Sequence, residues 1–494
     1  MKWIVITLLA ALALIGAGFL LTSTENSSVS HSPEALALCE EGTADQQAFR
    51  FQAAVDKLGR CLDLDPSLAE ASISRARALA QLGRGDEARQ ERARADSLTA
   101  LIEDPNRRMI AQLRLGGMQD SRYRAMYDSL MTRLQAEQPD DVFVRIAEAF
   151  QADYLGDADK RLAAWSRILE VNPNYANSYN MMGYIELAQG NYDQAIDHMQ
   201  KYAFLAPDLA NPHDSLGDVL MVLGRYEEAE EQYVKSVKKQ PDFYASLINL
   251  GRVYVTRGQF YKGMDILEKV RGEIAGTGLE RKVDSQIFDT YFVAGVMDEV
   301  DRMSAVFIDR YPQDGKTPFL RAMRKAYGND FQGGQAIMDS TLAVWRIGDE
   351  YQRSPRIRLE IDAMARLYDA LVADISSDPE TRVRVWQNMV SLVEARRPFH
   401  EQWFERYHLA QALLDADRPT EALPLLKNML NVNARLVNPL ILVVECNLTL
   451  KRLEPARKAL AHLHKTISVS DPSYPARAKA ADLDRRVARL EGSL

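Results

Sequence analysis

The sequence repeats itself with a period of 34 residues between Val142 and Phe260, and this period limits the possible folds more than any other feature. Proline recurs at one position of the repeat, and glycine recurs at two others. The prolines are Pro139, Pro173, Pro207 and Pro241, and the glycines are Gly156, Gly190, Gly224 and Gly258, with a second series at Gly183, Gly217 and Gly251. A 34-residue period with this punctuation is typical of stacked two-helix units. We therefore expect an all-α solenoid of antiparallel helix pairs.

Each repeat is expected to contain a helix A followed by a helix B. Gly190 and its equivalents stand where helix A ends, because glycine tolerates the left-handed turn found there. Pro173 and its equivalents end helix B, since proline cannot continue a helix interior. The residue after the proline (Asp140, Asn174, Asp208 or Asp242) is expected to cap the next helix A.

The mid-helix glycines point to close packing within each repeat. Glycine inside a helix costs about 1 kcal/mol relative to alanine, so Gly183 and Gly217 make sense only where helix B approaches closely. Trp165, Met199 and Tyr233 share one position of helix B. We interpret these three side chains as core residues and not as a cofactor site.

The clearest repeat is residues 174–208, NYANSYNMMGYIELAQGNYDQAIDHMQKYAFLAPD. Its Gly183, Gly190, Tyr192, Ala195 and Pro207 fill the signature positions of the tetratricopeptide repeat, and the sequence resembles that family. The resemblance implies a right-handed α-solenoid of about 11–12 antiparallel helix pairs after an amino-terminal apolar helix. It also implies a concave groove that binds a protein or peptide. The block 201–243 is similar to repeat arrays of bacterial proteins, which suggests a membrane-anchored or exported member.

The amino-terminal segment predicts membrane attachment. The run from Trp3 to Leu21 is apolar and has about the length of a membrane-spanning helix of ~20 residues. We expect a signal anchor over residues 1–22, a linker over 23–32, and the repeats outside the cytoplasm. Cleavage of the segment would instead release a secreted or periplasmic protein, and both alternatives remain open.

Changes in the repeat pattern divide the rest of the chain. We expect divergent repeats over 33–141, core repeats over 142–275 and divergent repeats over 276–348. The register slips by three residues within 271–282, which indicates a loop or an irregular joint. Residues 349–494 form a last region, where the absence of glycine from Asp349 to Glu491 predicts different turns. Ala422 and Ala456 resume the 34-residue step there, and Tyr474 to Leu490 is expected to cap the open end.

The sequence contains no recognisable catalytic, cofactor-binding or metal-binding motif. The formal net charge of −8 argues against nucleic acid as a partner. The histidine at His400 in "HEQWFE" lacks the second histidine of a zinc helix. Cys39 and Cys61 lie on the two helices of the first repeat and could either form a disulfide or remain free.

The inner face of helix A is the candidate binding surface. Each repeat is numbered from Ala176 or its equivalent 34 residues away. At about 100° per residue, positions 2, 5, 9 and 12 then face away from the core. The candidate groove residues are Phe143, Phe150, Asn177, Asn180, Tyr184, Asn211, Asp214, Asp218 and Arg252. We expect an extended partner segment with an apolar anchor and a basic or amide-pairing portion, because buried polar groups need partners.

The function predicted from these features is a non-enzymatic scaffold for protein–protein interaction in the cell envelope, without cofactor or small-molecule substrate. Two alternatives remain. One is a subunit of an export, polysaccharide or pilus assembly machine. The other is an enzyme with its active site in the carboxy-terminal helical region.

Overall fold

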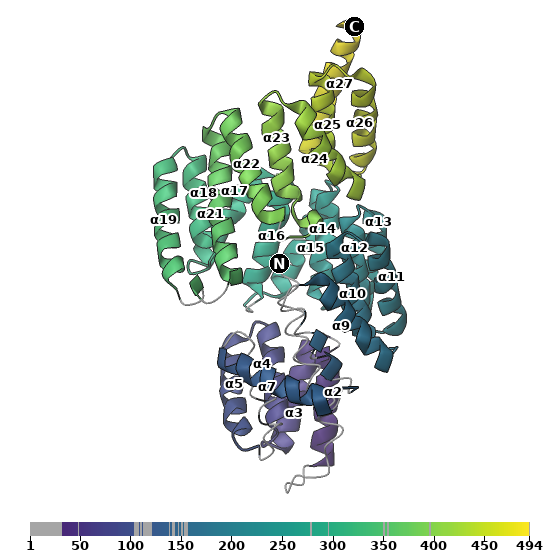
Figure 1. Cartoon of the computed structure of the whole chain (residues 1–494), viewed down its shortest axis with the longest axis vertical. Coiled ribbons are helices and arrows are strands. Elements are labelled where there is room, and N and C mark those ends of the chain that lie inside the picture. The colour runs from purple at the N-terminus through teal and green to yellow at the C-terminus, as the bar shows by residue number, and fades with distance from the viewer. Residues whose placement is uncertain are drawn as a thin grey trace. The chain divides into compact units, whose positions relative to one another are not determined.

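The computed structural model is all-α in the part of the chain that it describes, and this confirms the all-α part of the predicted fold class (Figure 1). It describes residues 32–493 except 48, 103–107, 109–110, 112–120, 138, 141–143, 147, 150–151, 153–156, 277–278, 295, 349–350, 353–354 and 395–396. The predicted anchor over 1–22 lies outside these residues.

The chain divides into two compact units. The first comprises Met1–Leu216, Lys235–Phe243 and Ile274–Glu280, and the second comprises Gly217–Val234, Tyr244–Glu273 and Arg281–Leu494. The helices from the amino-terminal end are α2 Pro33–Gln47, α3 Phe51–Leu64, α4 Ala69–Gln81, α5 Gly85–Thr99, α7 Ser121–Glu137, α9 Ala158–Val171, α10 Ala176–Gln189, α11 Tyr192–Leu205, α12 Asn211–Val222 and α13 Tyr226–Lys239. The following helices are α14 Tyr244–Thr256, α15 Phe260–Glu273, α16 Glu280–Ala294, α17 Met297–Arg310, α18 Thr317–Tyr327, α19 Phe331–Ile347, α21 Pro355–Ser376, α22 Pro379–Glu394, η1 Phe399–Glu401, α23 Trp403–Asp415, α24 Pro419–Val432, α25 Val437–Thr449, α26 Leu453–Thr466 and α27 Pro475–Ser493.

The mid-helix glycines lie against helix B, as the sequence predicts. A Cβ atom added at each of these glycines would crowd a side chain of helix B in the same repeat. The contacts are Gly183 with Met199 Cε at 2.8 Å, Gly217 with Tyr233 Cε1 at 2.6 Å and Gly251 with Leu267 Cγ at 2.8 Å. Trp165, Met199 and Tyr233 are buried, which confirms that they belong to the core. Glycine at these positions therefore allows the two helices of each repeat to approach closely.

Left-handed turns between helices A and B recur along the array. Gly190, Gly224 and Gly258 have φ of 85°, 71° and 75°, which confirms the prediction at these three positions, and Gly156 lies outside the described residues. The different turns expected in the glycine-free region are not found at Asp417 and Lys451, whose φ values are 58° and 55°. These residues are again separated by one repeat, so the same turn persists without glycine. The packing of the flanking helices holds the backbone there despite the side chain.

We expect Lys451→Gly to raise the free energy of unfolding by about 1 kcal/mol, because glycine adopts a positive φ without the Cβ penalty. Lys451 is exposed, so the substitution removes little packing. Asp417→Gly is the matched control and should gain less, since aspartate tolerates the left-handed region better than lysine. Urea denaturation measures both variants. A loss of stability in Lys451→Gly would show that the strain is absent.

The caps predicted at Asn174, Asp208 and Asp242 are wrong, because the helices begin later than expected, whereas the residues that follow Asp140 (141–143) lie outside the described residues. Helix α10 begins at Ala176, and its N-cap residue Tyr175 makes no side-chain cap hydrogen bond. Pro173 and Asn174 are the central residues of a tight turn, closed by the amide of Tyr175 donating to the carbonyl of Asn172 at 3.0 Å. Equivalent hydrogen bonds at Leu209 and Phe243 close the same turn in the next two repeats. Proline suits the second position of such a turn, so Asn174, Asp208 and Asp242 are turn residues.

Cys39 and Cys61 form a disulfide, which settles the alternative that the sequence left open. Their Cα atoms lie 5.5 Å apart, and the bond joins helices α2 and α3 of the first repeat. Both cysteines are buried in the apolar cluster between these helices. The third cysteine, Cys446, is buried and free.

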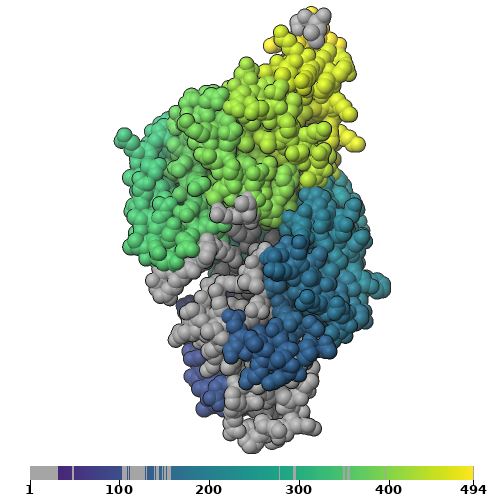
Figure 2. Space-filling view, viewed as in Figure 1, coloured from purple at the N-terminus to yellow at the C-terminus, as the bar shows by residue number. Residues whose placement is uncertain are grey.

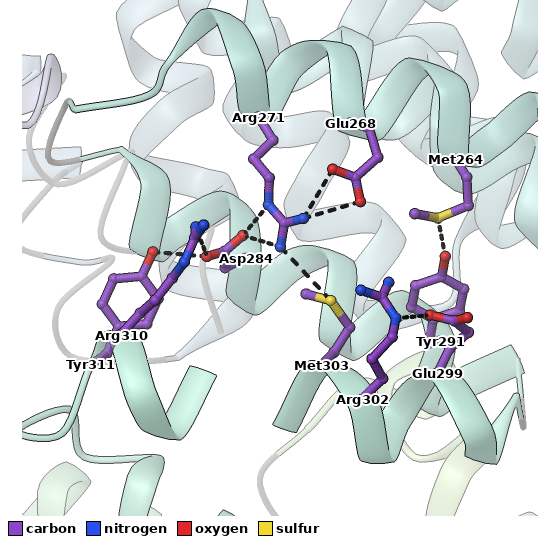
Figure 3. A network of polar contacts seen from close by, with 10 residues as sticks. All are labelled: Met264, Glu268, Arg271, Asp284, Tyr291, Glu299, Arg302, Met303, Arg310 and Tyr311. Carbon is purple, nitrogen blue, oxygen red and sulfur yellow. Dashed lines mark hydrogen bonds and ion pairs between the residues drawn. The ribbon is translucent and has the colours of Figure 1, made fainter. Parts of the chain in front are cut away.

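The irregular joint falls between helix α15, which ends at Glu273, and helix α16, which begins at Glu280. A buried carboxylate ties the helices around it together (Figure 3). Arg271 donates to Asp284 Oδ1 from Nε and Nη2, each at 2.8 Å, and the hydroxyl of Tyr311 donates to Oδ2 at 2.8 Å. Asp284 is completely buried, so these charge-assisted hydrogen bonds replace its lost hydration. The network thus connects α15, α16 and the end of α17 at the place where the 34-residue repeat register is interrupted.

Candidate functional site

The predicted groove residues of the first unit are largely enclosed. Asn180, Asn211 and Asp214 are buried, whereas Asn177 and Tyr184 are partly exposed. Asn211 donates from Nδ2 to the hydroxyl of Tyr202 at 3.0 Å. Phe143 and Phe150 lie outside the described residues. In this unit, only Asn177 and Tyr184 of the described candidates therefore present side chains to solvent.

In the second unit, the structure brings two of the candidates together through a residue that the sequence analysis missed. Asp218 Oδ1 accepts hydrogen bonds from the hydroxyl of Tyr233 at 2.8 Å and from Asn249 Nδ2 at 3.0 Å. Arg252 Nη1 donates to Asn249 Oδ1 at 3.0 Å. Asn249 occupies position 6 of its repeat, outside the set that the helical-wheel argument selected. Asp218 and Arg252 are thus the two ends of one polar ladder across α12 and α14.

A pocket of about 520 Å³ opens in the carboxy-terminal repeats, between helices α23, α25 and α27. It is lined by Gln411, Leu414, Asp415, Asp417, Glu445, Thr449, Lys479 and Arg486. These helices belong to the green-to-yellow body of Figure 2.

Three of the lining residues occupy the same repeat position as the predicted groove. Gln411, Glu445 and Lys479 follow one another at 34-residue steps, and so do Tyr184, Asp218 and Arg252. The two series share position 9 of the repeat, because Tyr184, Asp218, Gln411 and Glu445 each precede an alanine of helix B (Ala195, Ala229, Ala422 or Ala456) by the same 11 residues. Arg252 and Lys479 then follow at the next 34-residue step. The 34-residue step between Ala422 and Ala456 is visible in the sequence, but the rule that positions 2, 5, 9 and 12 of helix A face away from the core was applied only to the core repeats. Its extension to the carboxy-terminal repeats would have found the pocket.

The two sides of the pocket carry opposite charges. Glu445, largely buried, lies between Lys479 Nζ at 2.7 Å and Arg486 Nη1 at 3.2 Å. Both cations come from α27, and 42% and 38% of their side chains remain exposed. On the other side, Asp415 accepts from Gln411 Nε2 at 2.9 Å and is paired with Arg382 Nη1 at 2.9 Å, whereas Asp417 is exposed. A ligand could therefore meet basic groups on α27 and acidic groups beside α23.

Helix α23, which supplies part of the pocket lining, also carries residues of an aromatic cluster. Asp374 accepts a hydrogen bond from Trp386 Nε1 at 2.8 Å and is paired with His408 Nδ1 at 2.9 Å. The imidazole of His408 stacks on the indole of Trp386, with ring centroids 4.6 Å apart. Burial, together with the negative charges of Glu445 and Asp415, raises the pKa of Tyr407 to about 12, so its phenol stays protonated. The cluster fixes the orientation of α23 through packing and hydrogen bonds.

Among the residues that the structure describes, no group of three His, Cys, Asp or Glu side chains is placed to hold a metal ion. Over the same residues, no helix is long and apolar enough to span a membrane, and the apolar segment 3–21 falls outside them.

Comparison with known proteins identifies the repeats. Models of the tetratricopeptide repeat match residues 164–197, residues 39–105 and 215–271, and residues 406–427. None of the curated proteins matches the chain significantly.

Solved structures with a similar arrangement include the Cut9–Hcn1 hetero-tetramer of the APC/C, at 13% identity and a TM-score of 0.42, covering 92% of this chain and 83% of that chain. MamA is similar at 18% identity and a TM-score of 0.27 over 30% of this chain and 89% of that chain. A thermophilic tetratricopeptide repeat protein of Thermus thermophilus is similar at 16% identity and a TM-score of 0.26 over 45% of this chain and 99% of that chain. The matches to the repeat models extend from the first helix pair into the carboxy-terminal region that lines the pocket, and the matched segments of the chain are tetratricopeptide repeats, as the sequence predicts.

Proposed function

We propose that this protein is a non-enzymatic scaffold that binds an extended segment of a protein partner in the pocket between α23, α25 and α27. The observation that carries the proposal is the alignment of Gln411, Glu445 and Lys479 at position 9 of three successive repeats, around a pocket of about 520 Å³. Side chains repeated along one face match a partner that runs along the array. A polar, open pocket suits a peptide better than an apolar small molecule.

The lining chemistry favours a partner segment that carries both charges. Lys479 and Arg486 would attract an acidic side chain, and Asp415 and Asp417 would attract a basic one. Leu414 supplies an apolar contact between these groups. Glu445 already forms ion pairs with both Lys479 and Arg486, so a carboxylate of the partner would bind beside Glu445 to the same two cations. The sequence-derived expectation of an apolar anchor with a basic portion therefore extends to a mixed-charge segment.

The test is site-specific photocrosslinking in cells. A photoreactive amino acid at Gln411 should crosslink to one defined partner segment, and Lys479→Glu should abolish the crosslink by placing a second carboxylate beside Glu445. Arg485→Glu is the matched control, since Arg485 is exposed on the same helix but does not line the pocket. Crosslinking that survives Lys479→Glu, or that Arg485→Glu weakens equally, would remove the pocket as the binding site. Tyr184→Ala in parallel tests the groove of the first unit.

We also propose that the repeats act in the cell envelope, outside the cytoplasm. Two observations support this: the apolar segment 3–21 and the Cys39–Cys61 disulfide, a bond that persists mainly in oxidising compartments. The full chain should pellet with membranes and resist carbonate extraction. A free protein beginning after residue 22 would instead indicate cleavage. The crosslinked partner would decide between a simple scaffold and a subunit of an export, polysaccharide or pilus assembly machine.

Thiol labelling in intact cells tests the compartment independently. Cys39 and Cys61 should resist alkylation until a reductant is added. Cys446 should remain unlabelled in both conditions until the protein unfolds, because burial raises the pKa of its thiol to about 12. Alkylation of Cys39 and Cys61 without reductant would contradict an oxidising location.

A further inference from the structure

Two turns of the carboxy-terminal repeats lie on two turns of the core repeats within the second unit. In the first contact, Asn433 donates from Nδ2 to the hydroxyl of Tyr226 at 3.1 Å. Arg435 places its guanidinium over the ring of Tyr226, 4.8 Å from the centroid, and binds Glu227 at 2.5 Å. Asn433 and Tyr226 are both buried. These contacts join residues far apart in the chain, although repeat arrays normally contact only their neighbours.

The second contact has the same form one repeat later. The amide of Asp471 donates to the carbonyl of Gly258 at 2.9 Å. Its carboxylate accepts from the amide of Tyr261 at 3.2 Å, at the amino-terminal end of α15, where a negative charge is favourable. The ring of Tyr474 packs edge-on against Phe260, with centroids 5.3 Å apart. Tyr474 is buried by this contact and by its own repeat.

The glycines of the core turns make both contacts possible. A Cβ atom at Gly224 would clash with the side-chain amide of Asn433, and one at Gly258 would clash with the ring of Tyr474. At Gly190, the equivalent turn of the first unit, the nearest atom would be 3.9 Å away. Gly190 is therefore needed only for its positive φ, whereas Gly224 and Gly258 are needed also for close approach.

The docked turns lead directly into the pocket helices. Helix α25, which carries Glu445, begins at Val437 immediately after the turn that contains Asn433 and Arg435. Helix α27, which carries Lys479, begins at Pro475 immediately after Tyr474. The contacts therefore fix the first turn of two of the three helices that form the pocket.

We infer that the turn-on-turn contacts form a clasp that holds α25 and α27 in the arrangement that forms the pocket. The clasp consists of Asn433, Arg435, Asp471 and Tyr474, which contact the turns at 224–227 and 258–261. A closed clasp presents Glu445 and Lys479 preorganised for a partner, and an open clasp releases both helices together. Preorganisation strengthens binding because less conformational freedom is lost when the partner arrives. The effect on the partner rests on the proposed function, but the clasp itself does not.

Hydrogen exchange in the full chain tests the clasp without a partner. Gly258→Ala and Arg435→Ala should each speed amide exchange in residues 437–449 and 475–493 by about tenfold or more, as expected when a local opening becomes easier. Gly190→Ala is the matched control, because it introduces the same positive-φ strain without the clash, and it should leave these helices unchanged. Arg435→Ala removes a partly exposed ion pair and the contact of its guanidinium with the ring of Tyr226, introduces no clash, and keeps the test valid if Gly258→Ala fails to fold. Unchanged exchange in both clasp variants would overturn the inference.

Crosslinking from Gln411 supplies the second readout. The clasp variants should lose the crosslink although every pocket side chain is intact, and Gly190→Ala should retain it. Faster exchange with full crosslinking would overturn the link between clasp and pocket. If the unaltered protein gives no crosslink while exchange responds as expected, the proposed function fails and the clasp stands.

Discussion

Gly217→Leu should lower the free energy of unfolding by about 3 kcal/mol or more, the upper range for overpacking a core. A Cβ atom at this position would lie 2.6, 2.8 and 2.9 Å from three ring atoms of Tyr233. The ring is buried, and its hydroxyl donates to Asp218, so it cannot move aside without losing that hydrogen bond. Guanidinium denaturation followed by circular dichroism would measure the change.

Alanine substitutions at two equivalent glycines separate this clash from helix propensity. Gly183→Ala meets the flexible end of Met199, at 2.8 Å from Cε, so the neighbour can yield. Gly183→Ala should therefore lower the free energy of unfolding far less than Gly217→Ala does. In both variants, the gain of about 1 kcal/mol in helix propensity offsets part of the loss. Equal losses in the two variants would show that the rigid ring of Tyr233 does not decide the outcome.

Asp284→Ala should destabilise the second unit by about 3–5 kcal/mol, the usual cost of removing one partner from a buried ion pair. Asp284 is 0% exposed, and its removal leaves the hydroxyl of Tyr311 without its acceptor and leaves Arg271 paired only with Glu268, whose carboxylate is partly exposed (Figure 3). The thermal transition of the second unit, followed by hydrogen exchange in α15 and α16, is the measurement.

Asp289→Ala on the same helix is the control. Asp289 pairs with Lys316 Nζ at 2.9 Å, but 45% of its side chain is exposed, so the pair should contribute at most about 1 kcal/mol. A loss in Asp284→Ala no larger than in Asp289→Ala would mean that the network in Figure 3 does not hold the irregular joint together.

The sequence alone determined the features that depend on neighbouring residues along the chain. The 34-residue period predicted the helix pairs, the left-handed turns at Gly190, Gly224 and Gly258, and the packing of Gly217 against helix B. These follow from local spacing because a helix has a constant rotation per residue and each repeat packs on the next. The inner-face rule also identified position 9, although it was applied to Tyr184, Asp218 and Arg252 and not to Gln411, Glu445 and Lys479.

The sequence-based predictions were wrong where one local pattern is compatible with two structures. Asn174 after Pro173 suits a helix cap and a turn equally well, and the hydrogen bond that closes the turn decides between them. The absence of glycine suggested new turns in the last region. Asp417 and Lys451 nevertheless adopt the left-handed conformation, because the packing of the helices on both sides offsets the strain of a single residue.

Tertiary structure decided what depends on residues far apart in the chain. The pairing of Cys39 with Cys61 depends on the direction of each Cβ atom across two helices. The pocket requires three helices to converge, and the clasp joins Asn433 to Tyr226 and Asp471 to Gly258 across several intervening repeats. No periodic pattern encodes such contacts, because they depend on the accumulated geometry of all the repeats between them.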